Sequence, residues 1–171
     1  MEPKFVEKEE IILVGFSFFG DPFASSAGWT EENEIGRLWQ RLMAYLEKHA
    51  NRILHLQNAE VAYEVHVDHD ETPKRGHHEV FVGMQVERLE ALPPELLVKI
   101  LPPTQYAVFT LVGEQIVGDW PKQIYDWLHA SPYQLAYPYN FQYYDQRFKG
   151  LENIQDSILD IYVPVNAVER P

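Results

Sequence analysis

The feature that most constrains the fold of this chain is a repeat in the order of its predicted elements. Residues 11–19, IILVGFSFF, and residues 106–112, YAVFTLV, are rich in residues that favour strands, and each run is followed by a glycine. Apolar residues at helical spacing follow each run, over residues 30–50 and 116–129. Two more strand patterns complete each half. The sequence therefore predicts the order strand, helix, strand, strand, twice.

This repeat predicts an α+β fold with pseudo-twofold symmetry. Neither half can bury its apolar face alone, so we expect the halves, at about residues 5–88 and 97–168, to share one antiparallel sheet. Two main helices should cover one face of this sheet, and the seam between the halves should form a central groove. At 171 residues the chain has the length of a single domain, residues 1–171. The remaining predicted strands span residues 61–67, 79–87, 141–148 and 158–165.

Signals at the helix ends locate the two helices more closely. We expect Thr30 to cap the first helix, with two glutamates in its first turn. Pro121 fits a helix only near its start, so the second helix should begin with Asp119 or Gly118 just ahead of it. Residues 20–29 carry Phe23 and Trp29 and are interpreted as a surface connection rather than a lid. Residues 89–104, with a proline pair near each end, are interpreted as a connector with an extended middle.

Four histidines lie around the predicted hairpin tip at residues 68–78, namely His66, His69, His77 and His78. A hairpin could bring them together around a metal ion, but a zinc site needs a defined tetrahedral ligand set. We interpret the segment as a solvated tip and expect neither a metal nor a cofactor.

Charge and composition narrow the classes of partner. A formal net charge of -12 would repel the phosphates of a nucleic acid and an anionic membrane, so we expect no direct nucleic acid or membrane partner. The absence of cysteine excludes disulfides and thiol nucleophiles. The N-terminal residues are charged and no apolar run reaches the length of a membrane span, so a cytoplasmic location is expected.

The stretch FQYYDQRF at residues 141–148 combines aromatic and polar side chains as a binding strand would. Alternation places Gln142 and Tyr144 on one face, with Gln146 and Phe148, and Phe141 and Tyr143 on the other. One face therefore offers an amide, a phenol and a ring together. Ordinary cross-strand aromatic pairing is the alternative interpretation.

Several motifs together resemble one family. NEIGRLWQRL, VGMQV, PPTQYAVFTLVG, IYDWLHASPY, FQYYDQRF and DIYVPV occur in the order found in the GyrI-like small-molecule-binding domain, which is also the effector-binding module of AraC-type and MerR-type transcription regulators. The resemblance covers nearly the whole chain. It implies two fused strand-helix-strand-strand units around a groove for hydrophobic, aromatic and often cationic compounds, as in SOUL/GyrI-like folds.

The chain departs from the family pattern in two ways. It shows no helix-turn-helix, because the first strand pattern begins close to the N-terminus, so it resembles a stand-alone effector-binding domain whose regulatory effect would need a protein partner. The family also usually has a glutamate at the position of Gln142, which attracts cations. An amide there predicts a preference for neutral ligands.

The favoured hypothesis is a binding module for a small hydrophobic or aromatic, drug-like ligand. Aromatic faces would supply apolar contact, and phenol and amide groups would orient the ligand. We expect seven residues to line the groove: Trp39, Tyr63, Phe109, Trp127, Gln142, Tyr144 and Tyr162. For the aromatic members of this set, burial in the core is the alternative.

Two other functions stay open. Some GyrI-like proteins are hydrolases that open the cyclopropane rings of genotoxic compounds with pocket glutamates, and Glu34, Glu64 or Glu114 would have to fill that role here. Each of these is interpreted instead as a solvated charge, so catalysis is the weaker hypothesis. A protein-interaction module such as a gyrase inhibitor is the other, and the acidic charge would suit a basic partner surface.

Overall fold

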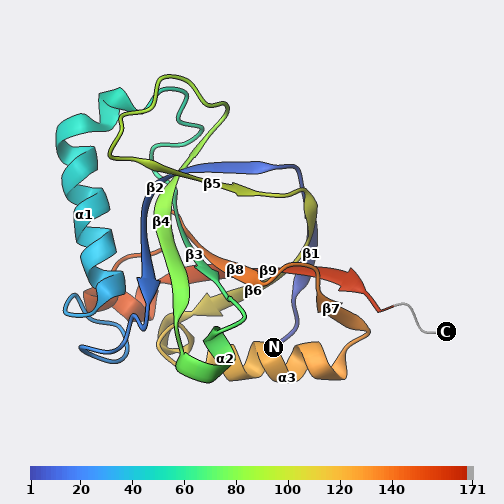
Figure 1. The fold of residues 1–171 in the computed structure, drawn as a ribbon. Coiled ribbons are helices and arrows are strands. Elements are labelled where there is room, and N and C mark those ends of the chain that lie inside the picture. The colour runs from blue at the N-terminus through green and yellow to red at the C-terminus, as the bar shows by residue number, and fades with distance from the viewer. Residues whose placement is uncertain (169–171) are drawn as a thin grey trace.

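A computed structural model describes residues 1–168 and shows a nine-stranded antiparallel sheet with two main helices (Figure 1). The strands pair in the order β1-β6-β9-β8-β3-β4-β2-β5, and β7 pairs with β9. Their bounds are β1 Lys4–Lys8, β2 Ile11–Gly20, β3 Ala62–Val67, β4 His78–Val86, β5 Leu97–Leu101, β6 Thr104–Val112, β7 Tyr133–Leu135, β8 Tyr139–Tyr144 and β9 Ile158–Ala167. The helices are α1 Glu34–His49, the short α2 Thr72–Arg75 and α3 Trp120–Ala130.

The sheet curls because two long strands bend and run across both halves. The chain passes directly from β1 into β2 and from β5 into β6. The β1–β6 pair and the β2–β5 pair share one register, since Lys8 lies opposite Thr104 and Ile11 lies opposite Leu101. The chain bends at residues 9–10 and at the proline pair 102–103. The strands at one end of the sheet, β1 and β6, therefore continue directly into those at the other end, β2 and β5. The sheet consequently folds around an apolar core (Figure 1).

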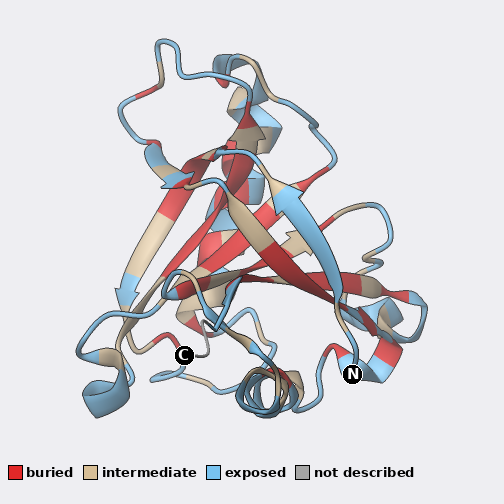
Figure 2. Ribbon diagram, turned by 90° about the vertical axis from the view of Figure 1, so that its right-hand side faces the viewer, coloured by how far each residue is buried: buried red, intermediate tan, exposed pale blue. Residues whose placement is uncertain are grey.

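Alternation divides the buried side chains into an inner core and two outer cores. Residues such as Leu13, Phe81 and Phe141 fill the inside of the curl. On the outer face, α1 covers one core, built from β2 and β4, and α3 covers the other, built from β6 and β9. Figure 2 shows buried residues concentrated on the strands and exposed residues on the outer surface of the helices. Both helices thus lie on one face of the sheet.

The α+β fold with its internal repeat is confirmed. β2-α1-β3-β4 forms one unit and β6-α3-β8-β9 forms the other. The two units meet where β3 pairs with β8, with Glu64 directly opposite Gln142. The extended middle of the connector at residues 89–104 is β5, which pairs with β2.

Several predicted boundaries are wrong. The first helix begins after Asn33, which caps it, because the preceding residues form a loop in which Thr30 accepts a hydrogen bond from the Glu32 amide instead. The second begins at Trp120 rather than residue 116, with Asp119 at its cap as expected. The aromatic strand ends at Tyr144, since Asp145 starts a turn in which its backbone carbonyl accepts from the amide of Phe148.

Sequence patterns missed β1 and β7 because both are short and mostly exposed. The predicted hairpin tip also contains one short helix, α2, which ends at Gly76 in a left-handed conformation with φ of 69°. None of the helices within residues 1–168 has the length and apolar character of a membrane span.

The close approach of β2 and β4 generates a prediction for stability. Gly15 lies directly opposite Gly83, and a Cβ built on Gly83 would lie only 2.3 Å from the carbonyl oxygen of Val14. We expect Gly83→Ala to lower the free energy of unfolding by about 1–3 kcal/mol, because the strands must separate. Urea denaturation measures this change.

Gly118→Ala is the control for that variant. Its added Cβ would meet two backbone carbonyl oxygens at 3.4 Å and the Cα of Gln115 at 3.8 Å, at an exposed position. We therefore expect a change within about 0.5 kcal/mol. Equal effects of the two substitutions would contradict the close strand approach.

Candidate functional site

A cavity of about 1480 Å³ opens between α1 and α3, on the face of the sheet that the helices cover. Its floor is the seam where β3 pairs with β8. Its walls come from the two helices, from the loop between β2 and α1, and from the turn after β8. Eight aromatic residues line it: Phe23, Trp29, Trp39, Trp120, Tyr125, Tyr139, Tyr144 and Phe148.

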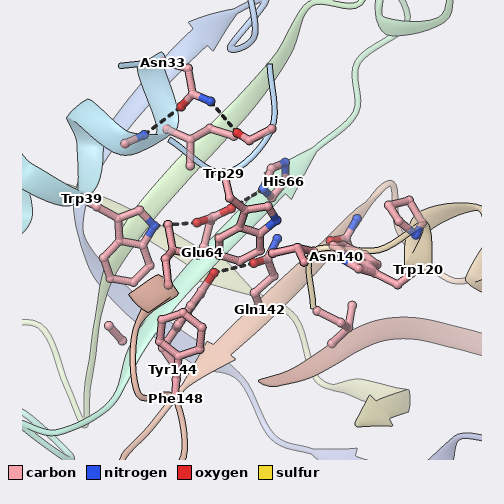
Figure 3. A pocket seen from close by; sticks show the side chains of 18 of the residues that line it. Trp29, Asn33, Trp39, Glu64, His66, Trp120, Asn140, Gln142, Tyr144 and Phe148 are labelled. Atoms are coloured by element: carbon pink, nitrogen blue, oxygen red, sulfur yellow. Dashed lines mark hydrogen bonds and ion pairs between the residues drawn. The ribbon is translucent and has the colours of Figure 1, made fainter. Parts of the chain in front are cut away.

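The floor is a ladder of polar pairs. On β3, Glu64 and His66 point into the cavity, while their neighbours Tyr63 and Val65 point into the inner core. The strand register places Glu64 opposite Gln142 and His66 opposite Asn140 (Figure 3). The side-chain oxygen of Asn140 is buried and has no hydrogen-bond partner within the described residues 1–168. An acidic group and two amides therefore lie together beneath the aromatic walls.

Glu64 is the central group of the site and is only 4% exposed. Trp39 on α1 donates its indole N–H to Oε2 of Glu64 over 2.5 Å, and Nε2 of His66 lies 2.7 Å from Oε1 (Figure 3). A buried carboxylate needs such partners, because removing a charge from water without them costs several kcal/mol. The two hydrogen bonds fix the carboxylate between α1 and β3.

Tyr144 and Gln142 form the second fixed pair of the floor. The Tyr144 hydroxyl donates to Oε1 of Gln142 over 2.6 Å. Burial, and to a smaller extent the nearby Glu64, raise the pKa of Tyr144 well above its usual value, so the phenol keeps the proton that it donates. Its ring packs edge-on against Trp39 at 4.8 Å and against Phe148 at 4.9 Å between ring centroids.

The loop between β2 and α1 forms one wall. Asn33 is 1% exposed and holds this loop to the helix: its Oδ1 accepts from the Gly36 amide, and its Nδ2 donates to the Gly28 carbonyl over 2.8 Å. Gly28 precedes Trp29, whose ring lies 6.3 Å from that of Phe148 between centroids. The interpretation of residues 20–29 as a mere surface connection is therefore wrong, since Phe23 and Trp29 line the cavity.

The charges around the cavity have one sign. Five carboxylates line it and, among the described residues that do so, there is no lysine or arginine. Those carboxylates belong to Glu31, Glu60, Glu64, Asp68 and Asp145. His66 and His78 are the only other ionisable lining groups besides tyrosines, again counting residues 1–168. The cavity therefore attracts cations and disfavours anions.

Three of the seven expected ligand-binding residues line the cavity, namely Trp39, Gln142 and Tyr144. The structure brings them together with Glu64 at the seam, through the indole and phenol hydrogen bonds. Their role in binding stays a prediction.

The other four lie elsewhere. Tyr63 and Tyr162 pack in the inner core, because strand alternation turns them away from the face that carries Gln142. The Tyr63 hydroxyl donates to Gln85 over 2.6 Å, and burial raises the pKa of Tyr162 to about 12. Phe109 of β6 and Trp127 of α3 pack edge-on at 5.1 Å between ring centroids, in the outer core under α3. Our expectation that all seven line one groove is thus incorrect.

Sequence reasoning placed Glu64 among the solvated charges, and that was wrong because both faces of β3 are covered. The signal was present: if Tyr63 and Val65 face the inner core, Glu64 and His66 must face the helices. Glu34 is about one-third exposed and pairs with Arg37, and Glu114 is exposed. The premise of a neutral groove also fails, since Glu64 supplies the carboxylate opposite Gln142.

The four histidines of the hairpin separate into two groups. His66 and His78 face the cavity and lie 3.3 Å apart between Nδ1 and Nε2. His69 and His77 pack against the ring of Phe19 outside the cavity.

The family model for "Cass2: Integron-associated effector binding protein" matches residues 4–165. The chain belongs to this family. The resemblance to GyrI-like effector-binding domains is thereby confirmed. The seam between the halves, with the cavity above it, lies inside the matched residues.

One similar protein is a longer transcriptional regulator. The chain is 30% identical over 168 residues to the transcriptional regulator BrlR of Pseudomonas aeruginosa, covering 96% of this chain and 56% of that protein. The chain thus spans little more than half the length of that relative.

Two solved structures share the fold of this family member. The structure of SAV2435 bound to tetraphenylphosphonium aligns with a TM-score of 0.68 at 15% identity, covering 97% of this chain and 94% of the other. The integron cassette protein VCH_CASS2 of Vibrio cholerae aligns with a TM-score of 0.59 at 18% identity, covering 97% of both chains.

Asn33 allows the loop wall to be tested separately from the helix. Asn33→Ala should lower the free energy of unfolding by about 1 kcal/mol, because the cap of α1 is lost. Asn33→Asp keeps the acceptor for the Gly36 amide but loses the donor to the Gly28 carbonyl. We expect this variant to retain more stability, with faster amide hydrogen exchange confined to residues 21–32. Unchanged exchange in that loop would show that Asn33 does not hold it.

Proposed function

We propose that the protein binds an aromatic, cationic small molecule as its effector, in the cavity above the β3–β8 seam. The observation that carries this proposal is the buried Glu64 carboxylate, which lies at the floor of an aromatic cavity. No lysine or arginine lines this cavity within the described residues 1–168. An anionic ligand would be repelled by five lining carboxylates and would meet no lysine or arginine among the described lining residues. A neutral apolar ligand would use the walls but gain nothing from the buried carboxylate.

The electrostatic contribution is large enough to select for charge. Opposite unit charges at 4 Å attract by about 4 kcal/mol at an effective dielectric constant of about 20, before the cost of desolvation is subtracted. Glu64 is already desolvated in the protein, so its share of that cost falls on folding rather than on binding. A surface carboxylate such as Glu60 would remain hydrated and screened by salt.

The walls suit the apolar part of such a ligand. Trp29 is 36% exposed, and Trp39 and Trp120 also line the cavity, so indole faces are available for stacking and for cation–π contact. Large aromatic surfaces near a carboxylate bind delocalised cations better than small hydrated ones, because less hydration is lost on entry.

The comparisons support an effector role for this ligand. The matching family is described as effector binding, and SAV2435, which shares the fold, was solved with the aromatic cation tetraphenylphosphonium. BrlR is a transcriptional regulator of which this chain covers about half. We therefore infer that the bound compound acts as a regulatory signal, read out by another segment or a protein partner. The net charge of -12 makes direct contact with nucleic acid unfavourable.

Charge selection can be tested with tetraphenylphosphonium and the neutral compound triphenylphosphine oxide. Isothermal titration calorimetry should give a stronger affinity for the cation in the native protein. Glu64→Gln should weaken cation binding by at least tenfold, about 1.4 kcal/mol, and change binding of the neutral compound by less than about threefold. Retained binding of the neutral compound shows that the cavity of the variant is intact.

Glu60→Gln is the matched control, because it removes the same charge from the exposed rim of the cavity. Its small effect should vanish at high salt, whereas the effect of Glu64→Gln should persist. If neither compound binds, or if the two substitutions act equally at high salt, Glu64 does not recognise the ligand.

A further inference from the structure

Glu64, His66 and His78 form a continuous chain of hydrogen bonds that leads away from the cavity floor. Oε1 of Glu64 lies 2.7 Å from Nε2 of His66, and Nδ1 of His66 lies 3.3 Å from Nε2 of His78. Nδ1 of His78 in turn lies 3.3 Å from the carbonyl oxygen of Gly76. The two imidazole rings stack at 5.4 Å between centroids.

The three contacts of Glu64, His66 and His78 need one hydrogen more than two neutral histidines supply. The Gly76 carbonyl can only accept, so Nδ1 of His78 carries a hydrogen. Nε2 of His78 therefore accepts from Nδ1 of His66. The remaining contact, between Nε2 of His66 and the carboxylate, also needs a hydrogen. Two neutral imidazoles provide only two of these three hydrogens.

We propose that His66 is the internal counter-ion of Glu64, and that a cationic ligand binds in exchange for the additional proton of the Glu64–His66–His78 chain. This inference rests on the proposed cation site. In the free protein the proton lies in the Glu64–His66 contact and neutralises the carboxylate. When a cation takes its place, one proton leaves to solvent. The two neutral imidazoles then supply hydrogens for only two of the three contacts, so His66 keeps its hydrogen bond to Glu64 and the hydrogen between His66 and His78 is lost.

The surroundings of the two histidines favour this location of the proton. Burial, and then repulsion from His66, lower the pKa of His78, so the charge resides at the Glu64 end. Two carboxylates, Asp68 and Asp21, lie near His78. The titratable group near Glu64 on the neighbouring strand is the Tyr144 phenol. Glu31, Glu60 and Asp145 lie farther out in the cavity lining. No group of three or more metal-binding side chains occurs in residues 1–168 that would explain the histidine pair as a metal site.

The exchange predicts a specific pH dependence of affinity. Histidine is in general the side chain whose charge changes between about pH 5 and 8, so affinity is measured over that range. Over the pH range in which the free protein holds the additional proton, the affinity for tetraphenylphosphonium should rise by about tenfold per pH unit. The reason is that one proton is released for each cation bound. Binding of triphenylphosphine oxide should not change over the same range. Calorimetry in buffers of different ionisation enthalpy should count the released proton directly.

His66→Asn removes the counter-ion, and His69→Asn is the matched control. His69 lies on the same hairpin, but its ring packs against Phe19 outside the cavity. We expect His66→Asn to lose the pH dependence and His69→Asn to keep it. If His66→Asn retains the full dependence, the proton belongs to Glu64 alone and His66 is not the counter-ion.

Nitrogen NMR of the histidine rings gives a readout that needs no substitution. His66 should show both ring nitrogens protonated, or shared with Glu64, in the free protein, and a neutral tautomer when tetraphenylphosphonium is bound. Cation binding without pH dependence or proton release would overturn this inference and leave the proposed function intact. Absence of cation binding at every pH would instead overturn the proposed function.

Discussion

The burial of one carboxylate at the junction of the two halves is the constraint on which the site depends. Glu64 is only 4% exposed, so the fold must supply its hydrogen-bond donors. Trp39 donates from α1, and His66, a neighbour on the same strand, lies at hydrogen-bond distance. These contacts fix the position of α1 over the seam. Since Trp39 also packs against Tyr144 of the second half, the group that would recognise the ligand also ties the two units together.

The curled sheet makes this burial possible by separating its two faces. One face of β3 and β8 builds the inner core with Val65 and Phe141, and the other presents Glu64 and Gln142 to the cavity. Because the inner core is closed by the long bent strands, the outer face between the helices need not be filled with apolar side chains. Stability and binding are thus assigned to opposite faces of the same strands, and a change of the cavity floor need not disturb the inner core.

The sequence predicted much of the fold and less of the site. Strand and helix periods are local, so the repeated order of elements and the outward position of Gln142 and Tyr144 could be read from them. Which residues of β3 share a side of the sheet with Gln142 depends on the register between β3 and β8, which places residue 64 opposite residue 142. This register is a non-local property that no local pattern reveals. Tyr63 was therefore assigned to the groove and Glu64 to solvent, whereas Tyr63 points into the inner core and Glu64 into the cavity. The loop wall depends on Asn33, whose two hydrogen bonds exist only once the helix has formed.

The pairing of Glu64 with Gln142 also explains why the expected position of the charge was misleading. The two residues occupy facing positions on the paired strands of the two units, where side chains directly opposite have Cβ atoms about 4.5–5.5 Å apart. Two carboxylates at that distance in a buried site could not both ionise, because each would strongly raise the pKa of the other. Only one of the two positions can therefore carry a useful negative charge, and the other is best filled by a neutral polar group. An amide at 142 does not imply a neutral groove. It implies that the charge resides on the other strand of the seam, at Glu64.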